Sequence, residues 1–261
     1  TLRVNRSDSV ALSGALSGLG SLEQAGGGTT TLTATNTHGA TTVSGGVLQV
    51  GNGGTAGTLG SGAVTLSAGT LRIDRSDTLT LAGSLSGAGT LDQHGAGTTV
   101  LTAANAGFSG AIDITGGTLR VSGNSAGAGS GAIAVGAHTL DIAGGASIAN
   151  DLSVAGGLIT SSSGGGTLAA GTAVNLGDGG SVHFSSAGGG TLAIARVLAD
   201  GGADDATVTI DSGTVALRAA NTYGGDTTVS GGTLQIVVRR REAYVGGHDV
   251  PDLHGTYSRV V

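Results

Sequence analysis

The chain has 261 residues, with Gly at 54 positions, a single Pro, no Cys, Met or Trp, and a formal net charge of -6. Gly is about three times as frequent as in average proteins, and aromatic residues at 2% exclude a compact core built on large rings. The acidic balance argues against nucleic acid as a partner, and the absence of Cys excludes disulfides, thiolate metal sites and Cys nucleophiles.

The apolar content separates this chain from disordered sequences rich in Gly and Ser. The mean hydropathy is +0.25 and charged residues make up 11% of the chain, whereas disordered segments combine low hydropathy with high net charge. No run of about 18 apolar residues occurs, so no transmembrane helix is predicted. The first ten residues, TLRVNRSDSV, lack the basic leader and apolar core of a signal peptide. If the protein is exported, we expect this chain to be a mature piece or a fragment of it.

A long internal repeat begins at the first residue. Residues 1–36 align with residues 70–105 without a gap, at an offset of 69. The stretch TLRVNRSDSVALSGALSGLGSLEQ of the first copy corresponds to TLRIDRSDTLTLAGSLSGAGTLDQ of the second. Self-similarity of this kind predicts a repeat architecture.

A shorter motif is nested in this repeat and occurs three times. Its copies are LTATNTHGATTVSGGVLQV at 32–50, LTAANAGFSGAIDITGGTLRV at 101–121 and LRAANTYGGDTTVSGGTLQI at 217–236. Each copy has Leu, then Asn four positions later, a turn, a short β-branched strand, Gly-Gly and a second strand. We predict that the Asn residues share one turn type and bond the nearby backbone, and that the Gly residues form corners. These structural turn positions are Asn36, Asn105, Asn221, Gly45, Gly46, Gly116, Gly117, Gly231 and Gly232.

Pairs of apolar residues two positions apart recur along the chain. Residues at i and i+2 share one face of a strand, so we predict strands of about three to five residues that end at Gly, Ser, Asn or Asp. The Thr run at 29–31 is expected on an exposed strand face. In chain order, the pairs are Leu2/Val4, Leu48/Val50, Val64/Leu66, Leu71/Ile73, Leu79/Leu81, Ile112/Ile114, Leu119/Val121, Ile133/Val135, Leu140/Ile142, Val182/Phe184, Leu192/Ile194, Val208/Ile210 and Val215/Leu217.

The longer period of the pattern is close to 20 residues. Leu2 and Leu22 are 20 residues apart, and Leu119 and Leu140 are 21 apart, so each interval holds about three short strands. The sequence therefore predicts an all-β fold, a right-handed parallel β-helix (solenoid) with about three short strands per coil and roughly 11 to 12 coils. A coil cannot bury its apolar face alone, so we expect neighbouring coils to stack about 4.8 Å apart.

The repeat pattern stops near residue 236. We therefore predict a β-helical repeat region over residues 1–236 and a non-repeat tail over residues 237–261. The tail holds the single Pro, two of the three Tyr and four of the 11 Arg. Two interpretations of it remain open: a natural cap or linker, because the open end of a β-helix exposes unpaired edges, or a truncation artefact.

The three nested copies resemble the autotransporter-associated β-strand repeat, whose typical form is L-x-x-x-N-T-Y-x-G-x-T-x-[VI]-x-G-G-x-L-x-[VI]. The third copy follows this form closely, with Asn221 and Tyr223 at the start of its turn. The first copy has His38 in place of Tyr, and the second carries Phe108 and is two residues longer. The nested copies cover a minor part of the chain directly, and the looser repeat covers most of residues 1–236.

This resemblance implies the passenger region of a type V secreted protein of Gram-negative bacteria. Such passengers form β-helices, cross the outer membrane through a C-terminal β-barrel and are displayed on the cell surface. The expected location is the cell surface or the extracellular space, with the outer membrane reached only through a barrel absent from this chain. The family includes adhesins, aggregation factors and cytotoxins. Expected partners are host glycans or matrix, or further copies of the chain, with no nucleic acid and no cofactor.

Two patterns are candidates for chemistry on the surface. GNSAG at 123–127 matches the G-x-S-x-G nucleophile elbow, but no helix is predicted after it, so a chance match is favoured. The segments 3–8 and 72–77 place Arg and Asp together, which could bind acidic sugars. The favoured interpretation is a solvated face with ion pairs worth at most about 1 kcal/mol each.

Two acidic segments are candidates for metal binding, and neither predicts a site. Asp200, Asp204 and Asp205 offer oxygen ligands for Ca²⁺, but the nonapeptide of calcium β-rolls is absent and an acidic surface loop is favoured. The segment HDVPDLH at 248–254 has no strong metal-site spacing. No catalytic, metal or cofactor-binding residue is predicted. The remaining histidines, expected at surface or turn positions, are His38, His94, His138 and His183.

The function predicted from these observations is that of a non-enzymatic cell-surface or secreted β-helical passenger fragment of a Gram-negative autotransporter, acting as a stalk or adhesin or in aggregation. Polar ladders on flat faces would offer many weak contacts in parallel. The alternative is a polysaccharide lyase or hydrolase on the same scaffold, which needs carboxylates, or Asp with Arg, converging on one groove. Ice binding would need unbroken T-x-T rows at one-coil spacing, and the Thr placement is irregular.

Overall fold

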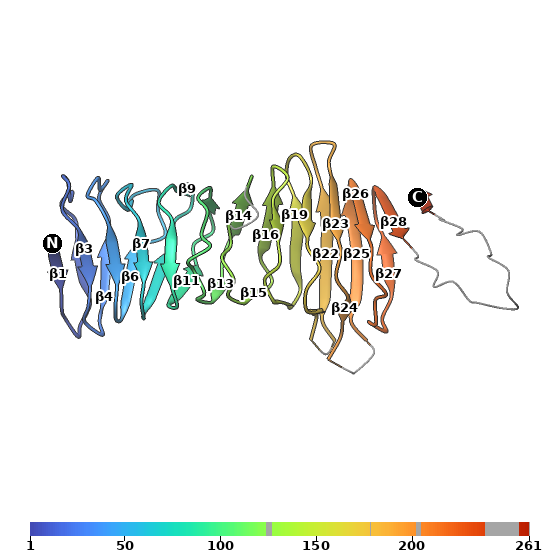
Figure 1. The fold of residues 1–261 in the computed structure, drawn as a ribbon, viewed down its shortest axis with the longest axis horizontal. Coiled ribbons are helices and arrows are strands. Elements are labelled where there is room, and N and C mark those ends of the chain that lie inside the picture. Colours follow the sequence, from blue (N-terminus) through green and yellow to red (C-terminus); the bar gives the residue numbers. More distant parts are fainter. Residues whose placement is uncertain (124–126, 178, 202–204, 238–255, 261) are drawn as a thin grey trace, which may run out of the picture.

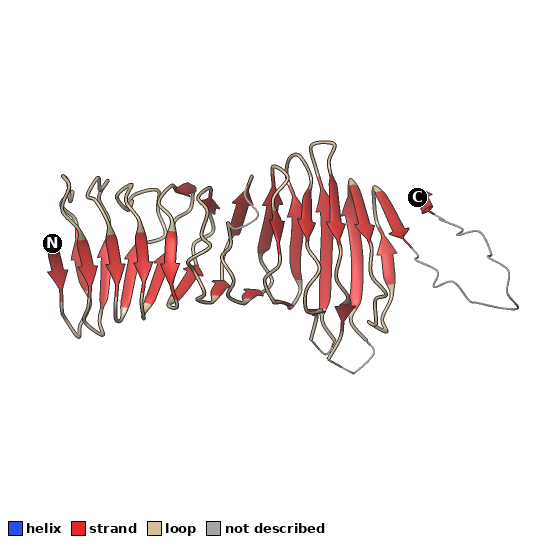
Figure 2. Ribbon diagram, viewed as in Figure 1, coloured by secondary structure: helices blue, strands red, loops and turns tan. Residues whose placement is uncertain are grey.

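The structure is a computed structural model that describes residues 1–123, 127–177, 179–201, 205–237 and 256–260. These residues form strands and loops that stack along one axis into an elongated rod (Figures 1 and 2). Within these ranges the chain forms no helix, and hence none that could cross a membrane.

The strands are short and are separated by turns. Their bounds are β1 (Leu2–Val4), β2 (Val10–Leu12), β3 (Leu22–Gln24), β4 (Thr29–Leu32), β5 (Thr41–Val43), β6 (Val47–Val50), β7 (Val64–Leu66), β8 (Thr70–Ile73), β9 (Thr78–Leu81), β10 (Leu85–Gly87), β11 (Thr90–Gln93), β12 (Thr98–Leu101), β13 (Ile112–Ile114), β14 (Thr118–Ser122), β15 (Ile133–Val135), β16 (Thr139–Ala143), β17 (Ser147–Ile148), β18 (Leu152–Val154), β19 (Gly157–Ser161), β20 (Gly166–Leu168), β21 (Val174–Asn175), β22 (Ser181–Ser186), β23 (Thr191–Ile194), β24 (Leu198–Ala199), β25 (Thr207–Ser212), β26 (Thr214–Leu217), β27 (Thr227–Val229), β28 (Thr233–Val237) and β29 (Thr256–Val260).

Four sheets run along the rod, and consecutive strands of each sheet come from successive coils. Sheet A has the order β1-β3-β5-β7-β10, and sheet B has the order β2-β4-β6-β8-β11-β13-β15-β18-β21-β24. Sheet C has the order β27-β25-β22-β19-β16-β14-β12-β9, and sheet D has the order β17-β20-β23-β26-β28-β29. Apart from the antiparallel β28–β29 pair, the pairs of named strands are parallel, so the fold is a parallel β-solenoid of about 11 turns.

The predicted all-β parallel β-solenoid, with about three short strands per coil, is confirmed. Each apolar pair at i and i+2 falls within a strand. The right-handed sense of the coil remains a prediction. Strand length is less uniform than expected, because β17, β21 and β24 have two residues and β22 and β25 have six.

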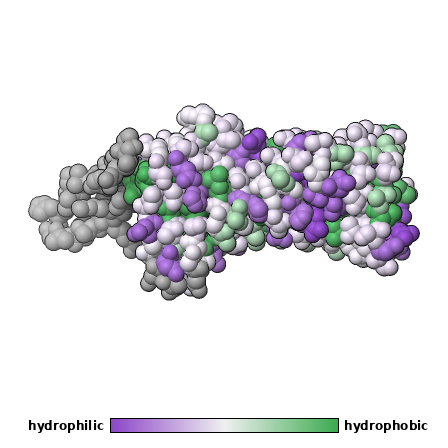
Figure 3. All heavy atoms as spheres, turned by 180° about the vertical axis from the view of Figure 1, so that it is seen from behind, coloured by the Kyte–Doolittle hydropathy of each residue, from purple (hydrophilic) through white to green (hydrophobic). Residues whose placement is uncertain are grey.

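The core is a single cluster of mostly aliphatic side chains that follows the rod. It contains two rings, Phe108 and Phe184, both fully buried. Leu, Ile and Val alternate with outward Thr, Arg, Asp and Ser along the strands, which is the period-two pattern of a sheet with one buried face. The face shown in Figure 3 is covered mostly by residues of intermediate hydropathy, with hydrophilic residues in separate patches. The fold is therefore stabilised by the stacking of neighbouring coils, which buries a small group of aliphatic side chains in each coil.

The internal repeat does not return to the same side of the rod. Its first strands, β1 and β3, belong to sheet A, whereas the aligned strands β8 and β11 belong to sheet B. The nested motif behaves in the same way. Its three copies use strands of sheets B and A, then C and B, then D and C. An offset of 69 residues thus spans three coils and one further side of the solenoid.

The C-terminal part of the described chain ends the parallel stack. β28 carries the last strand of the third nested copy, and β29 pairs with it in the antiparallel sense. Of the predicted tail, residues 238–255 and 261 lie outside the described residues. The boundary at residue 236 and the nature of the tail stay predictions.

Candidate functional site

The side chain of Asn36 connects three successive coils. Its Oδ1 accepts a hydrogen bond from the backbone N–H of Leu16 at 2.8 Å, and its Nδ2 donates to the Thr58 carbonyl at 2.8 Å. Nδ2 also donates to the nearby Ala34 carbonyl at 3.1 Å. Asn36 is buried. Because the donors and the acceptor of a buried amide must be satisfied by hydrogen bonds, this side chain fixes the spacing of the coils on either side.

The other two repeated Asn residues make corresponding contacts. Asn105 accepts from the Leu85 N–H at 2.7 Å and donates to the Gly127 carbonyl. Asn221 accepts from the Leu198 N–H at 3.0 Å. The three turn positions named from the sequence therefore serve contacts between coils, each on a different side of the rod.

The Gly-Gly pairs of the nested motif combine two requirements. The second Gly of each pair has positive φ, +54° at Gly46, +50° at Gly117 and +80° at Gly232. A Cβ on Gly46 would also lie 2.3 Å from the Gly28 carbonyl oxygen of the preceding coil. Gly is required there both by the left-handed backbone and by the approach of the next coil. The first members, Gly45, Gly116 and Gly231, do not have a left-handed φ, but a Cβ on each would also lie too close to the preceding coil.

In the first and third copies, the residue two positions after the repeated Asn contacts the first residue of the next strand. His38 Nε2 lies 2.9 Å from Thr41 Oγ1, and the Tyr223 hydroxyl lies 2.6 Å from Thr227 Oγ1. These two copies pair polar groups.

In the second copy the ring is Phe108, three positions after Asn105; it is fully buried, and the next strand begins with Ile112 instead of Thr. The turn and the start of the next strand are therefore polar in the first and third copies and apolar in the second.

His38 departs from the expectation of a surface position. It is 4% exposed, its Nδ1 has no hydrogen-bond partner, and burial lowers its pKa. It lies in the loop between β4 and β5. His94 and His183 are exposed, and His138 is half-buried.

Two buried Gln residues stabilise corners between strands, and this role was not predicted from the sequence. Gln24 Nε2 donates to the Gly26 carbonyl at 2.8 Å and to the Gly28 carbonyl at 3.2 Å, while its Oε1 accepts from Thr30. Thr30 is therefore buried rather than part of an exposed Thr face.

Gln93 and Thr99 repeat this arrangement in the second copy, with the Gly95 and Gly97 carbonyls as acceptors. The signal was present in the sequence, because both Gln and both Thr residues align at the offset of 69.

The Arg and Asp residues of segments 3–8 and 72–77 bind each other. Arg6 forms two hydrogen bonds with Asp8 at 2.8 and 2.6 Å, and Arg75 forms two with Asp77, both at 2.8 Å. Arg6 is exposed as expected for a solvated face, but Arg75 is 7% exposed and also donates to the Gly57 carbonyl. The loop of the preceding coil buries Arg75.

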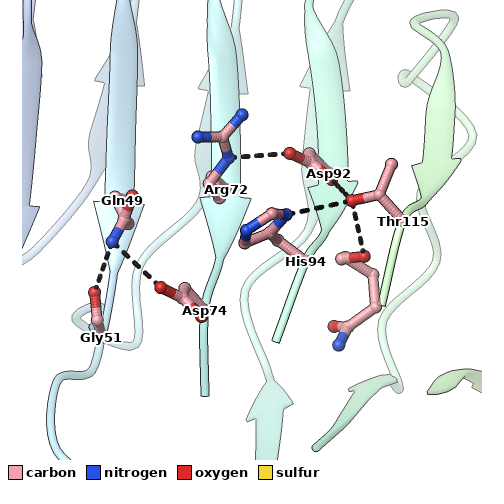
Figure 4. A network of polar contacts seen from close by, with 8 residues as sticks. Gln49, Gly51, Arg72, Asp74, Asp92, His94 and Thr115 are labelled. Atoms are coloured by element: carbon pink, nitrogen blue, oxygen red, sulfur yellow. Dashed lines mark hydrogen bonds and ion pairs between the residues drawn. The ribbon is translucent and has the colours of Figure 1, made fainter. Parts of the chain in front are cut away.

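Outward charges on neighbouring coils form ladders (Figure 4). Arg72 Nε lies 2.8 Å from Asp92 Oδ2, and Thr115 donates to the other oxygen of Asp92 at 2.6 Å. His94 Nδ1 approaches the same Thr115 hydroxyl at 3.2 Å. Asp113 occupies the rung after Asp92. This brings one Arg and two Asp residues together on sheet B, but the Asp92 side chain is only 9% exposed and both its oxygens are engaged.

Two similar ion pairs occur elsewhere. Arg3 lies 3.4 Å from Glu23 on sheet A, and Arg120 lies 2.6 Å from Asp141 on sheet C. The pairs join residues in register on adjacent coils.

Arg196, like Arg75, is a buried cation whose burial was not predicted from the sequence. It is 2% exposed, and burial lowers its pKa. Its guanidinium donates to the Ala169 carbonyl at 2.7 Å, to the Ile148 carbonyl at 3.1 Å and to the Asn150 carbonyl. Because Ile148 is 48 residues away, Arg196 reaches across two coils.

The other candidate sites do not come together. In the G-x-S-x-G match, residues 124–126 lie outside the described residues, as do Asp204 and the whole of 248–254. Asp200 and Asp205 accept backbone hydrogen bonds from Gly224 and Gly179 of neighbouring coils. Among the described residues, no cluster of three or more His, Asp or Glu side chains is placed to hold a metal ion.

A row of four Thr residues in register lies on sheet C. The outward residues of the next row are Thr80, Val100 and Arg120, so the paired T-x-T rows that ice binding would need are interrupted. The ladder consists of Thr78, Thr98, Thr118 and Thr139.

Comparison with known proteins identifies the repeats. The Passenger-associated-transport-repeat matches residues 22–50, 91–121 and 210–236. Each match contains one of the nested copies and begins earlier, so that it includes β3, β11 or the end of β25. No curated protein and no solved structure matches the chain. The repeats imply secretion by the type V pathway, and their arrangement on a β-solenoid is consistent with an autotransporter passenger domain.

Proposed function

We propose that this chain, which carries three passenger-associated transport repeats on a parallel β-solenoid, is a non-enzymatic part of a surface rod. It would act as a stalk or adhesin, or in aggregation, at the surface of a Gram-negative cell. The observation that supports the proposal is the placement of the three repeats in one continuous stack, where Asn36 and Asn105 bind the coils before and after them and Asn221 binds the coil before it. Such contacts hold successive coils together and so extend the rod, and they do not form an active site.

The polar side chains support a structural role over catalysis. The alternative function, a polysaccharide lyase or hydrolase, needs carboxylates free to bind or to move a proton. The best candidate is the row Arg72, Asp92 and Asp113, but Asp92 is held by Arg72 and Thr115. We expect its carboxylate to hold neighbouring coils together.

Display at the surface is tested with the complete natural gene expressed in Gram-negative cells. An epitope inserted after Gly53, in a loop where a side chain would meet open space, should be labelled by antibody on intact cells. Labelling that appears only after lysis would refute the proposal. Cells carrying the same epitope on a periplasmic protein are the control.

Adhesion and aggregation are tested on the same cells. Settling of a culture and binding to immobilised matrix or glycans should increase with display of the rod. Equal settling and binding by non-displaying cells would leave only the stalk role.

Catalysis is tested on the purified chain with pectin, alginate and hyaluronan. We expect no unsaturated sugar to be released. Release that is lost in the variant Asp92→Asn would establish the alternative function.

A further inference from the structure

A groove of about 280 Å³ opens between the third and fourth coils. One wall is the loop that contains Thr58, Leu59 and Gly60, and the other is β9 with Leu79, Thr80 and Leu81. Leu59, Leu79 and Leu81 are buried and form an apolar floor, while Thr80 is exposed at the rim. The groove is thus lined both by apolar Leu side chains and by polar groups of the backbone.

The second repeat contains the same site. Asn36 donates to the Thr58 carbonyl in the first repeat, and Asn105 donates to the Gly127 carbonyl in the second. The stretch GSGA follows at 60–63 and again at 129–132. Leu59 and Gly60 therefore correspond to Ala128 and Gly129.

In the second repeat a side-chain amide of the chain itself binds the corresponding carbonyls. Asn150 is buried, and its Nδ2 lies 3.2 Å from the Ala128 carbonyl oxygen, 3.3 Å from that of Gly129 and 2.7 Å from that of Gly131. The residue aligned with Asn150 at the offset of 69 is Leu81, which has no donor. At this position the first repeat therefore offers no side-chain amide to the carbonyls of Leu59, Gly60 and Gly62.

The opposite wall supplies a donor. β9 is the end strand of sheet C and pairs with β12. Thr98 of β12 directs its N–H back to the Asp77 carbonyl of the preceding coil, and Thr78 is in register with Thr98. Alternate residues of parallel strands direct their backbone groups to the same side, so the Thr80 N–H points toward the groove.

The two walls approach each other on either side of the groove. At one end the Ser76 N–H donates to the Gly54 carbonyl at 3.0 Å. At the other, a Cβ on Gly83 would lie 2.0 Å from the Gly62 carbonyl oxygen. These contacts favour a compact group over a continuous polypeptide strand as the occupant.

We propose that this groove binds the acetamido group of an N-acetylhexosamine residue in a glycan. Its N–H donates to the Leu59 or Gly60 carbonyl, as Asn150 does in the second repeat. Its carbonyl accepts from the Thr80 N–H, and its methyl group packs on Leu79 and Leu81. This assignment rests on the proposed function, because it names a glycan as the partner of the surface rod.

The test is a titration of the purified chain followed by NMR of its Leu methyl groups. N-acetylglucosamine should shift the methyl signals of Leu59 and Leu79 saturably, and glucose, which lacks the acetamido group, should not. The matched variant is Leu81→Asn, which installs the amide of the second repeat and should weaken binding at least tenfold. Ala82→Trp, at the exposed rim of the groove, should block it independently.

Three outcomes would overturn the assignment. They are the absence of a saturable shift, an equal shift with glucose, and undiminished binding by Leu81→Asn with an unchanged β-type circular dichroism spectrum. A saturable shift with N-acetylalanine methylamide but not with the sugar would reassign the groove to peptides. Because the assay uses the isolated chain, its failure leaves surface display untouched, and a failure of display leaves this result untouched.

Discussion

The two Arg-Ser-Asp segments show how one sequence acquires two environments along the rod. Arg6 and Arg75 form the same two-bond contact with the Asp two residues later. Arg6 is exposed, but Arg75 is covered by the loop of the third coil and donates to the Gly57 carbonyl. The local sequence therefore determines the ion pair, and the preceding coil determines its burial.

The same distinction applies to the sides of the solenoid. The first and second repeats place equivalent strands on sheets A and B, and on B and C, without losing the Asn and Gln contacts. The motif is thus independent of the side on which it lies, provided that coils stack before and after it. This agrees with stability that arises from nearest-neighbour contacts in repeat proteins.

The largest effect should follow loss of the amide at Asn105. Asn105→Ala leaves the Leu85 N–H and the Gly127 carbonyl without their partner in a buried site. Each unpaired group costs about 1 to 3 kcal/mol, so we expect the free energy of unfolding to fall by about 3 kcal/mol. Asn221→Ala, at a half-buried position, should cost less. Urea denaturation measures both, and equal losses would contradict the dependence on flanking coils.

A smaller loss is expected from Arg75→Ala. The variant removes the donor to the Gly57 carbonyl and the stem that packs in the covered site, so unfolding should become easier by about 2 kcal/mol. Arg6→Ala, at the exposed copy, should leave the denaturation midpoint unchanged. If both variants shift the midpoint equally, the burial by the preceding coil has no energetic consequence.

The turn pairs allow a double-mutant cycle between copies. His38→Phe removes the partner of the Thr41 hydroxyl, and Thr41→Ile removes the partner of His38 Nε2. The double variant introduces the two apolar residue types that the second copy carries in this turn, at Phe108 and Ile112. We expect it to be more stable than the sum of the single effects by about 1 kcal/mol. Additive losses would show that the two positions are independent.

The fold was predictable because its signals are local and repeated. The i, i+2 pairs such as Leu71/Ile73 specify strands, and the 20-residue spacing specifies the coil. The shift of each repeat by one side was not evident, since it depends on how many residues each corner and loop uses. The two-residue strands β17, β21 and β24 were missed for the same reason, because so short a strand has no periodicity of its own.

The site was only partly predictable. The Asn and Gly-Gly positions stand out through repetition, but their partners lie on other coils, as with Asn36 and Leu16. Burial of His38 and Arg75 could not be deduced from residue type, since polar residues of these kinds are usually exposed. The groove beside Leu81 is recognised only when it is compared with Asn150 in three dimensions.

The smallest predicted effect concerns pH and His38. Burial lowers the pKa of His38 in the folded chain, whereas in the unfolded chain it titrates near its usual value of about 6.5. Below that pH the unfolded chain binds more protons, so stability should fall as the pH drops toward the folded pKa, by at most about 1.4 kcal/mol per pH unit. Urea midpoints at pH 7.5 and 5.0 measure this fall. His38→Phe should reduce it, while His94→Phe, at an exposed position, should retain it. Identical profiles for the wild type and His38→Phe would mean that the unpartnered Nδ1 is accommodated when protonated.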